Sequence, residues 1–308
     1  MTEIAVSAKN IVKKFGDFTA INGVNLTVPK GSIYGFLGPN GCGKSTTIRV
    51  LTGLLKPTSG NVNVLGLAIP KQAEALRLRI GYMTQKFSLY DDLSVVENLQ
   101  FIAQIFGMPR HVYQQRIDQQ LSIYGLTRLK QQRVGGMSGG QKQRLSLATA
   151  TMHQPELLFL DEPTSAVDPE NRREFWEQLF DLSDQGTTIL VTSHYMDEAE
   201  RCHRLAIMEA GKLRADDEPE VLMNNLGVNI IEVKAPNLRN LKERLLACHE
   251  VRSAAQLGIR LRVLIYQEVT DPIHWLQYRF PELVTAELTP ARPSLEDVFV
   301  SVTGVGRQ

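Results

Sequence analysis

A glycine-rich octapeptide, GPNGCGKS at residues 38–45, separates an apolar run from a helical segment. It fits the pattern G-x-x-x-x-G-K-[ST] without a gap. Residues 33–37 (IYGFL) predict a buried strand before it, and residues 46–55 predict a helix after it. In that order, backbone N–H groups and the N-terminus of a helix surround a phosphate. An ordinary glycine-rich turn is the alternative, and these two flanks argue against it. We therefore predict an α/β fold with a nucleotide site here.

Each part of this loop has an expected task at a bound nucleotide. Glycines lack a Cβ atom, so the backbone can wrap closely around phosphates. We expect Lys44 to reach the β- and γ-phosphates and the Ser45 hydroxyl to bind Mg²⁺. Because a thiol at a helix N-terminus can have a lowered pKa, we also expect Cys42 to be reactive and its alkylation to block ATP binding. The predicted nucleotide-binding residues of this segment are Gly38, Pro39, Asn40, Gly41, Cys42, Gly43, Lys44, Ser45 and Thr46.

A second apolar run, LLFL at residues 157–160, is followed directly by Asp161 and Glu162. Such a run predicts a core strand of a parallel sheet. Ligands of open α/β sheets bind at the carboxyl ends of the strands. We therefore predict that Asp161 binds Mg²⁺, and that Glu162 is the general base or orients the attacking water. A simple strand-end cap is the alternative, and the phosphate loop upstream argues against it.

A third segment, MSGGQ at residues 137–141, precedes a helical pattern that runs to residue 150. With these three segments the chain resembles the ATP-binding subunits of ABC transporters over about residues 3–217. The resemblance implies that a second copy closes over the nucleotide. Ser138, Gly139, Gly140 and Gln141 of one copy would then meet the γ-phosphate held by the other, with the N-terminus of their helix aimed at it. The family segment begins with Leu, and Met137 is an apolar replacement.

Two further residues gain a catalytic role from the resemblance. Gln85 follows a strand-like run at residues 80–84 and is expected to contact Mg²⁺ and the attacking water. His194 follows the β-branched run at residues 187–193 and is expected to hydrogen-bond the γ-phosphate. The implied catalytic residues are thus Glu162, His194, Gln85 and Lys44, and the implied Mg²⁺ ligands are Ser45, Gln85 and Asp161.

Two more residues complete the expected ATP site. Phe15 occupies the place from which the family stacks an aromatic ring on adenine, usually Tyr, and Phe18 is its competitor. Asp168 ends the segment SAVD at residues 165–168, which resembles the D-loop of the family.

Pattern and resemblance together predict two domains. Residues 3–217 would form an ABC ATPase cassette, with a RecA-like α/β core, an antiparallel β-subdomain and a helical subdomain around the helical pattern of residues 95–121. Residues 218–228 are expected to be a linker, which begins within a charged break, DDEPE at residues 216–220. Residues 229–308 alternate in the order βαββαβ and end in a helix, which predicts a small α+β ferredoxin-like domain.

Composition limits the partners and the location. A net charge of +1 provides no attraction to nucleic acid. No apolar run approaches the ~18 residues of a membrane span, and the N-terminus is not a signal peptide. Three scattered cysteines suit a reducing cytoplasm. We therefore expect a peripheral protein at the cytoplasmic face of the cell membrane. The transmembrane pore would be formed by separate integral membrane permease subunits.

Two stretches favour the exporter branch of the family. SHYMDEAE at residues 193–200 and SLEDVF at residues 294–299 resemble ATPases of drug, antibiotic and polysaccharide exporters. We expect an ATP-hydrolysing, energy-coupling subunit of a multidrug or small-molecule exporter, working as a homodimer or with a closely similar second cassette. The alternatives are an importer ATPase and a soluble ABC ATPase acting on ribosomes or DNA. The identity of the cargo stays open because the cassette does not touch it. The C-terminal domain could regulate the ATPase, mediate dimerisation or only stabilise the fold.

Overall fold

The computed structural model describes residues 3–85, 87–165 and 167–303. The chain divides into two compact units, Met1–Leu213 and Arg214–Gln308. This division falls slightly before residue 217, where the cassette was predicted to end, and the predicted boundaries remain predictions. Ala166 of the expected D-loop and residues 304–308 of the expected C-terminal domain lie outside the described residues.

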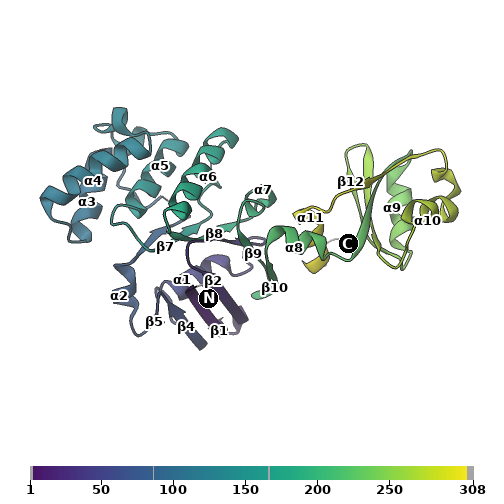
Figure 1. The fold of residues 1–308 in the computed structure, drawn as a ribbon, viewed down its shortest axis with the longest axis horizontal. Coiled ribbons are helices and arrows are strands. Elements are labelled where there is room, and N and C mark those ends of the chain that lie inside the picture. The colour runs from purple at the N-terminus through teal and green to yellow at the C-terminus, as the bar shows by residue number, and fades with distance from the viewer. Residues whose placement is uncertain (1–2, 86, 166, 304–308) are drawn as a thin grey trace. The chain divides into compact units, whose positions relative to one another are not determined.

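The first unit is built on a six-stranded sheet in which β3, β6, β7, β8 and β9 pair in parallel (Figure 1). Every residue of the three central strands β3, β7 and β8 is buried, as expected for strands covered on both faces. The strand order is β10(Lys212–Asp217), β9(Arg204–Glu209), β3(Ile33–Leu37), β8(Thr188–Ser193), β7(Leu157–Asp161) and β6(Ile80–Met83).

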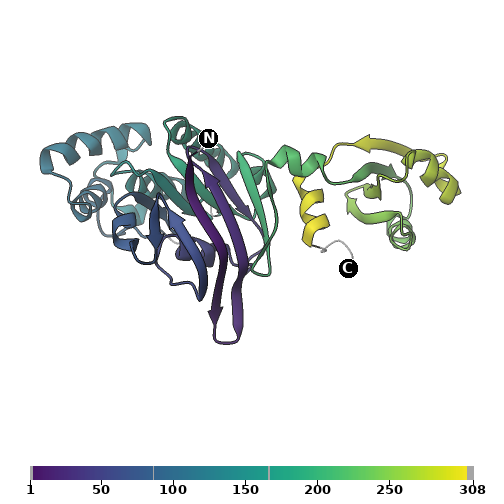
Figure 2. The same cartoon turned by 60° about the horizontal axis from the view of Figure 1, so that its bottom comes forward.

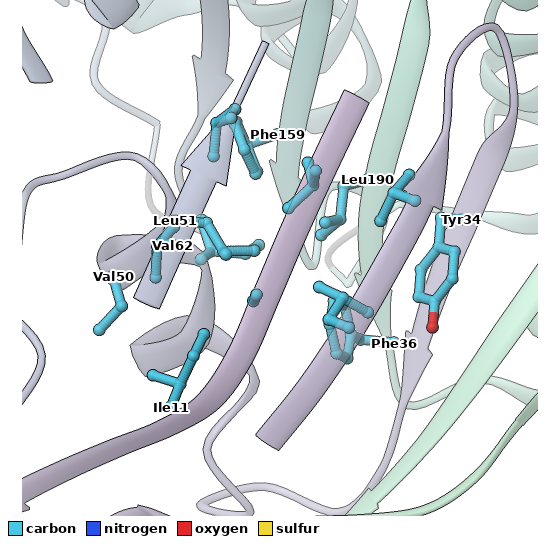
Figure 3. Close-up of a cluster of buried hydrophobic side chains, with 14 of the residues drawn as sticks. Ile11, Tyr34, Phe36, Val50, Leu51, Val62, Phe159 and Leu190 are labelled. Carbon is cyan, nitrogen blue, oxygen red and sulfur yellow. The ribbon is translucent and has the colours of Figure 1, made fainter. Parts of the chain in front are cut away.

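An antiparallel sheet forms the second layer of this unit. Its strand order is β2(Phe18–Pro29), β1(Ile4–Phe15), β4(Ser59–Val64) and β5(Leu67–Ile69). β1 and β2 form one long hairpin, purple in Figure 2. Ile11 of β1 and Val62 of β4 belong to one buried cluster with Leu51 of α1(Lys44–Leu51), Phe159 of β7 and Leu190 of β8 (Figure 3). This shared core holds α1, and the loop before it, against the ends of the central strands.

The predicted helical region exists as two helices, α3(Val95–Ile105) and α4(Arg110–Ile123). They are separated because Gly107 adopts a left-handed φ of 64° and Pro109 lies directly before α4. The helix after the glycine loop is also shorter than predicted and ends at Leu51. Gly53, with φ 72°, terminates it in the manner of a left-handed C-cap. The other helices of this unit are α2(Ala73–Arg77), α5(Gly139–Ala150), α6(Pro169–Asp184) and α7(Met196–Ala199).

The second unit contains the predicted order of elements, βαββαβ followed by a helix. Its antiparallel sheet has the order β12-β13-β11-β14, and α9 and α10 contribute to a buried core on one face. The alternating pattern of residues 283–288 predicts the last strand there, but β14 begins only at Glu287, because Pro281–Leu283 forms a 3-10 turn before it. The elements are α8(Pro219–Asn224), β11(Val228–Lys234), α9(Leu238–Leu246), β12(Val251–Leu257), β13(Arg260–Tyr266), α10(Pro272–Arg279), β14(Glu287–Ala291) and α11(Leu295–Thr303).

Candidate nucleotide site

The glycine loop connects the end of β3 to the start of α1. A Cβ atom on Gly38 would collide with the carbonyl oxygen of Met208, and one on Gly43 with that of Ala20, so the chain requires glycine at both positions. Lys44 lies across the loop, where Nζ donates to the carbonyl oxygens of Gly38 (2.8 Å) and Pro39 (3.2 Å). Lys44 therefore ties the first turn of α1 to the backbone at the start of the loop. The remaining predicted loop residues are Asn40 and Gly41, which are exposed, and Ser45 and Thr46, which are half-buried.

Asp161 accepts hydrogen bonds from two hydroxyl groups that belong to different elements. Ser45 Oγ of α1 donates to Asp161 Oδ1 at 2.9 Å, and Thr192 Oγ1 of β8 donates to the same oxygen at 2.8 Å. Only 3% of Asp161 is exposed. A hydroxyl and a carboxylate oxygen in this arrangement are the hard oxygen donors that Mg²⁺ prefers. The predicted pair Ser45 and Asp161 therefore fits the ion.

Glu162 is the centre of the predicted catalytic group. Its Oε1 lies 3.4 Å from Lys44 Nζ, and its Oε2 accepts a hydrogen bond from Gln85 Nε2 at 3.0 Å. The Nδ1 atom of His194 lies 3.6 Å from Oε2 and has no hydrogen-bond partner among the described residues. Glu162 has a left-handed φ of 48°, which is rare for a residue with a side chain and clusters at functional sites. Three residues predicted from distant parts of the sequence, Lys44, Gln85 and His194, thus converge on the carboxylate of Glu162.

Cys42 departs from its prediction. Burial raises the pKa of the Cys42 thiol, and the nearby Lys44 charge opposes this only in part. The side chain is 4% exposed and belongs to the buried core beneath the loop. The expectation of a lowered pKa was wrong, because desolvation of the thiolate outweighs the favourable position near the helix N-terminus.

Ser138 and Gln141 form a capping box at the start of α5. The Gln141 N–H donates to Ser138 Oγ at 3.3 Å, and the Ser138 N–H donates to Gln141 Oε1 at 2.9 Å. Ser138 and Gly139 are exposed, whereas Gly140 is buried against the side chain of Asn171. The side-chain hydrogen bonds described for Ser138 and Gln141 lie within the cap itself, so this segment presents an exposed helix N-terminus.

The two aromatic candidates for adenine stacking lie side by side. Phe15 and Phe18 pair across the turn between β1 and β2 and are 48% and 64% exposed. Lys13 Nζ lies 5.0 Å from the centre of the Phe15 ring, so that ring already contacts a cation. The exposure of the two rings does not decide which one stacks on adenine, so the assignment of Phe15 to this role stays a prediction.

A family model described as ABC transporter matches residues 21–165. A Nod factor export ATP-binding protein I of Burkholderia lata is 36% identical over 303 residues, which are 97% of each chain. The chain belongs to the ATP-binding subunits of ABC transporters. The family and the mixed α/β cassette fold that the sequence predicted are thereby confirmed.

Other proteins similar to this ABC subunit are also ATP-binding cassettes of the same family. A probable multidrug ABC transporter ATP-binding protein, YbhF of Escherichia coli K12, is 45% identical over 220 residues, or 71% of this chain. The match spans only 38% of the YbhF length. A dimeric ATP-binding cassette solved with ADP and Pi has a TM-score of 0.63 and 28% identity, covering 69% of this chain and 98% of that one. Within the described residues no helix is long and apolar enough to span a membrane.

Asp168 of the ABC cassette caps α6 at the end of the expected D-loop. Its Oδ1 accepts from the Asn171 N–H at 3.1 Å and its Oδ2 accepts from Asn171 Nδ2 at 2.7 Å. These hydrogen bonds from Asn171 lower the pKa of Asp168. Asn171 also packs on Gly140, so the D-loop and the Ser138 segment are linked through one side chain.

Thr192 is a site residue that the sequence reasoning missed. Besides binding Asp161, its Oγ1 accepts the Glu162 N–H at 2.8 Å. Thr192 pairs with Asp161 across the parallel strands β8 and β7. A polar residue near the end of the buried run 188–193 was the available signal, but the register of the two strands is needed to interpret it.

Proposed function

We propose that this chain is the ATP-hydrolysing subunit of an exporter. The observation that carries the proposal is Glu162, held among Lys44, Gln85 and His194 at 3.4, 3.0 and 3.6 Å. Phosphoryl transfer to water requires a positioned water and compensation of charge on the phosphate oxygens. The four side chains have the chemistry for both tasks.

The residues divide the work of hydrolysis. Lys44 exchanges its contacts with the Gly38 and Pro39 carbonyls for the β- and γ-phosphates, to which it offers a compact positive charge. Glu162 accepts a proton from the attacking water or orients it, and Gln85 fixes the carboxylate through its hydrogen bond. His194 donates to the γ-phosphate. Ser45 and Asp161, with the Gln85 amide oxygen as the third predicted ligand, would hold Mg²⁺, which neutralises phosphate charge when bound.

Two copies complete each site in this proposal. The exposed N-terminus of α5, with Ser138, Gly139, Gly140 and Gln141, is a site for an anion and would meet the γ-phosphate held by the second chain. The solved dimeric cassette among the structural neighbours supports this arrangement. The second chain would be an identical copy or a closely similar cassette.

Export is favoured by the names of the relatives, one a Nod factor export protein and one a probable multidrug transporter protein. Neither the importer nor the ribosome or DNA alternative receives such support. We propose that the dimer binds integral membrane permease subunits at the cytoplasmic face of the membrane. A tagged chain should copurify with a multi-span permease in mild detergent. Recovery with ribosomes alone would contradict export.

Hydrolysis is tested by the steady-state release of phosphate from ATP by the purified chain. Glu162→Gln should lower kcat by about 100-fold or more, since positioned groups of this kind contribute roughly 10²–10⁴. Glu243→Gln is the matched control, because Glu243 is an exposed residue of α9 in the second unit. Equal turnover by wild type and Glu162→Gln would refute the assigned role.

A further inference from the structure

Glu198 is a buried carboxylate that the proposed mechanism does not use. It lies on the short helix α7, and only 1% of it is exposed. Two hydroxyl groups donate to it: Ser193 Oγ to Oε2 at 2.6 Å and Thr164 Oγ1 to Oε1 in a short hydrogen bond. Burying a carboxylate is unfavourable unless such partners compensate it. Both of its oxygens are therefore satisfied by groups from other segments.

The two donors lie close in sequence to two residues of the proposed catalytic group, His194 and Glu162. Ser193 directly precedes His194, and its Oγ also accepts the Tyr195 N–H at 3.0 Å. The bonds of one hydroxyl thus fix the backbone on both sides of His194. Thr164 follows the left-handed turn at Glu162, which the hydrogen bond from Ser165 N–H to the Glu162 carbonyl closes at 3.3 Å. Glu198 joins the turn that carries the base to the turn that carries the histidine.

Arg172 of α6 supplies the opposite charge. Its Nε lies 3.5 Å from Glu198 Oε1, and its guanidinium carbon lies 4.1 Å from the centre of the Tyr195 ring. The same side chain is 3.6 Å from the carboxylate of Asp197, which is 65% exposed. Since α6 begins at the Asp168 cap, a third segment of the nucleotide site is attached to the same carboxylate.

We infer that Glu198 is a positioning residue for hydrolysis, which holds His194 against Glu162 through Ser193 and Thr164. The inference rests on the proposed function. The side chain of Glu198 contacts Thr164, Ser193 and Arg172, and acts through the geometry of two turns. Displacement of a catalytic group by about 1 Å can cost roughly 100-fold in rate. The loss of Glu198 should therefore appear in kcat before it appears in ATP binding.

Glu198→Gln is the sharpest variant because it keeps the shape of the side chain. It removes the charge that faces Arg172, and replaces one of two acceptors with a donor where Thr164 and Ser193 both donate. We expect kcat to fall about 10- to 100-fold, with the KM for ATP and the melting temperature close to wild type. Glu200→Gln is the matched control, because Glu200 is the exposed C-cap residue of the same helix, and it should keep wild-type kcat. Ser193→Ala is a milder second test, with a smaller loss of kcat.

A double variant distinguishes the positioning of His194 by Glu198 from a general stabilisation of the fold. If Glu198 acts through His194, then Glu198→Gln should cost less than about twofold in a His194→Ala background, because residues that act as a unit are not additive. A full extra loss in that background would overturn the inference. So would unchanged kcat in Glu198→Gln, or a loss of ATP binding and melting temperature in parallel with kcat. Absence of hydrolysis by the wild type would instead overturn the proposed function, and the inference with it.

Discussion

At the scale of single residues, the buried hydroxyl of Thr192 connects the side chain of Asp161 to the backbone of Glu162. One side-chain oxygen donates to Asp161 and accepts from the Glu162 N–H, at 2.8 Å in each case. The left-handed conformation of Glu162 needs such support, because backbone in that region is strained for a residue with a side chain. Thr192 thus contacts the backbone of Glu162, the proposed base, and the side chain of Asp161, the proposed Mg²⁺ ligand.

Thr192→Val should therefore lower both stability and turnover. The substitution keeps the β-branched shape but leaves the Glu162 N–H buried without an acceptor. We expect the free energy of unfolding to fall by about 1–3 kcal/mol. The measurement is urea denaturation without nucleotide, alongside steady-state kcat. Thr19→Val, on strand β2 with no side-chain hydrogen bond among the described residues, is the control. A stability equal to wild type would show that the Thr192 hydroxyl is dispensable.

At the scale of elements, two of the capping boxes among the described residues differ in their surroundings. Ser94 with Glu97 starts α3, and Ser138 with Gln141 starts α5. Ser94 is 6% exposed, whereas Ser138 is exposed. An N-cap stabilises its helix to a similar extent in either place, but only an exposed helix N-terminus can receive a phosphate from a second chain.

Ser138→Ala and Ser94→Ala form a matched pair. Each should cost about 1 kcal/mol of unfolding free energy, the usual value for a lost N-cap. Only Ser138→Ala should also weaken the ATP-dependent association of two chains, as measured by sedimentation at several protein concentrations. Equal association by both variants would argue against a role for the α5 N-terminus at the nucleotide.

Local signals predicted the elements better than their ends. The glycine loop, the strand before it and the helical patterns that contain α3 and α5 follow from the sequence pattern alone. The break between α3 and α4 depends on Gly107 and Pro109, and the spacing of apolar residues does not reveal it. Thr192 and Glu198 could not be predicted, because their importance comes from contacts between segments distant in sequence: strand register for Thr192, and the approach of Thr164 for Glu198.

At the scale of the whole molecule, each unit has its own core and its own tryptophan, Trp176 in the first and Trp275 in the second. In the second unit Arg262 holds Asp297 of α11 through two hydrogen bonds of 2.9 and 2.7 Å. Burial alone would raise the pKa of Asp297, but hydrogen bonds from Arg262 and Ser294 outweigh it and lower that pKa. The ion pair thus attaches the final helix to strand β13.

Asp297→Asn should destabilise the second unit in a pH-dependent way. Because the folded-state pKa is lowered, the carboxylate stabilises the fold fully above its unfolded pKa of about 4 and loses this effect as pH falls further. Wild type should therefore exceed Asp297→Asn in stability at pH 7, and the two should converge as the pH falls through the lowered pKa of folded Asp297. Urea denaturation followed by Trp275 fluorescence, with Trp176→Phe in both proteins, reports this unit. A constant difference at every pH would contradict the ion pair.

The most direct measurement of the central claim is the mass of Glu162→Gln by light scattering after size exclusion, with and without MgATP. Closure of two chains over nucleotide predicts a monomer without ATP, and with ATP a dimer that retains two ATP molecules. A protein that binds ATP with the expected loss of turnover, yet stays monomeric at every concentration, would contradict the claim that a second copy completes the site.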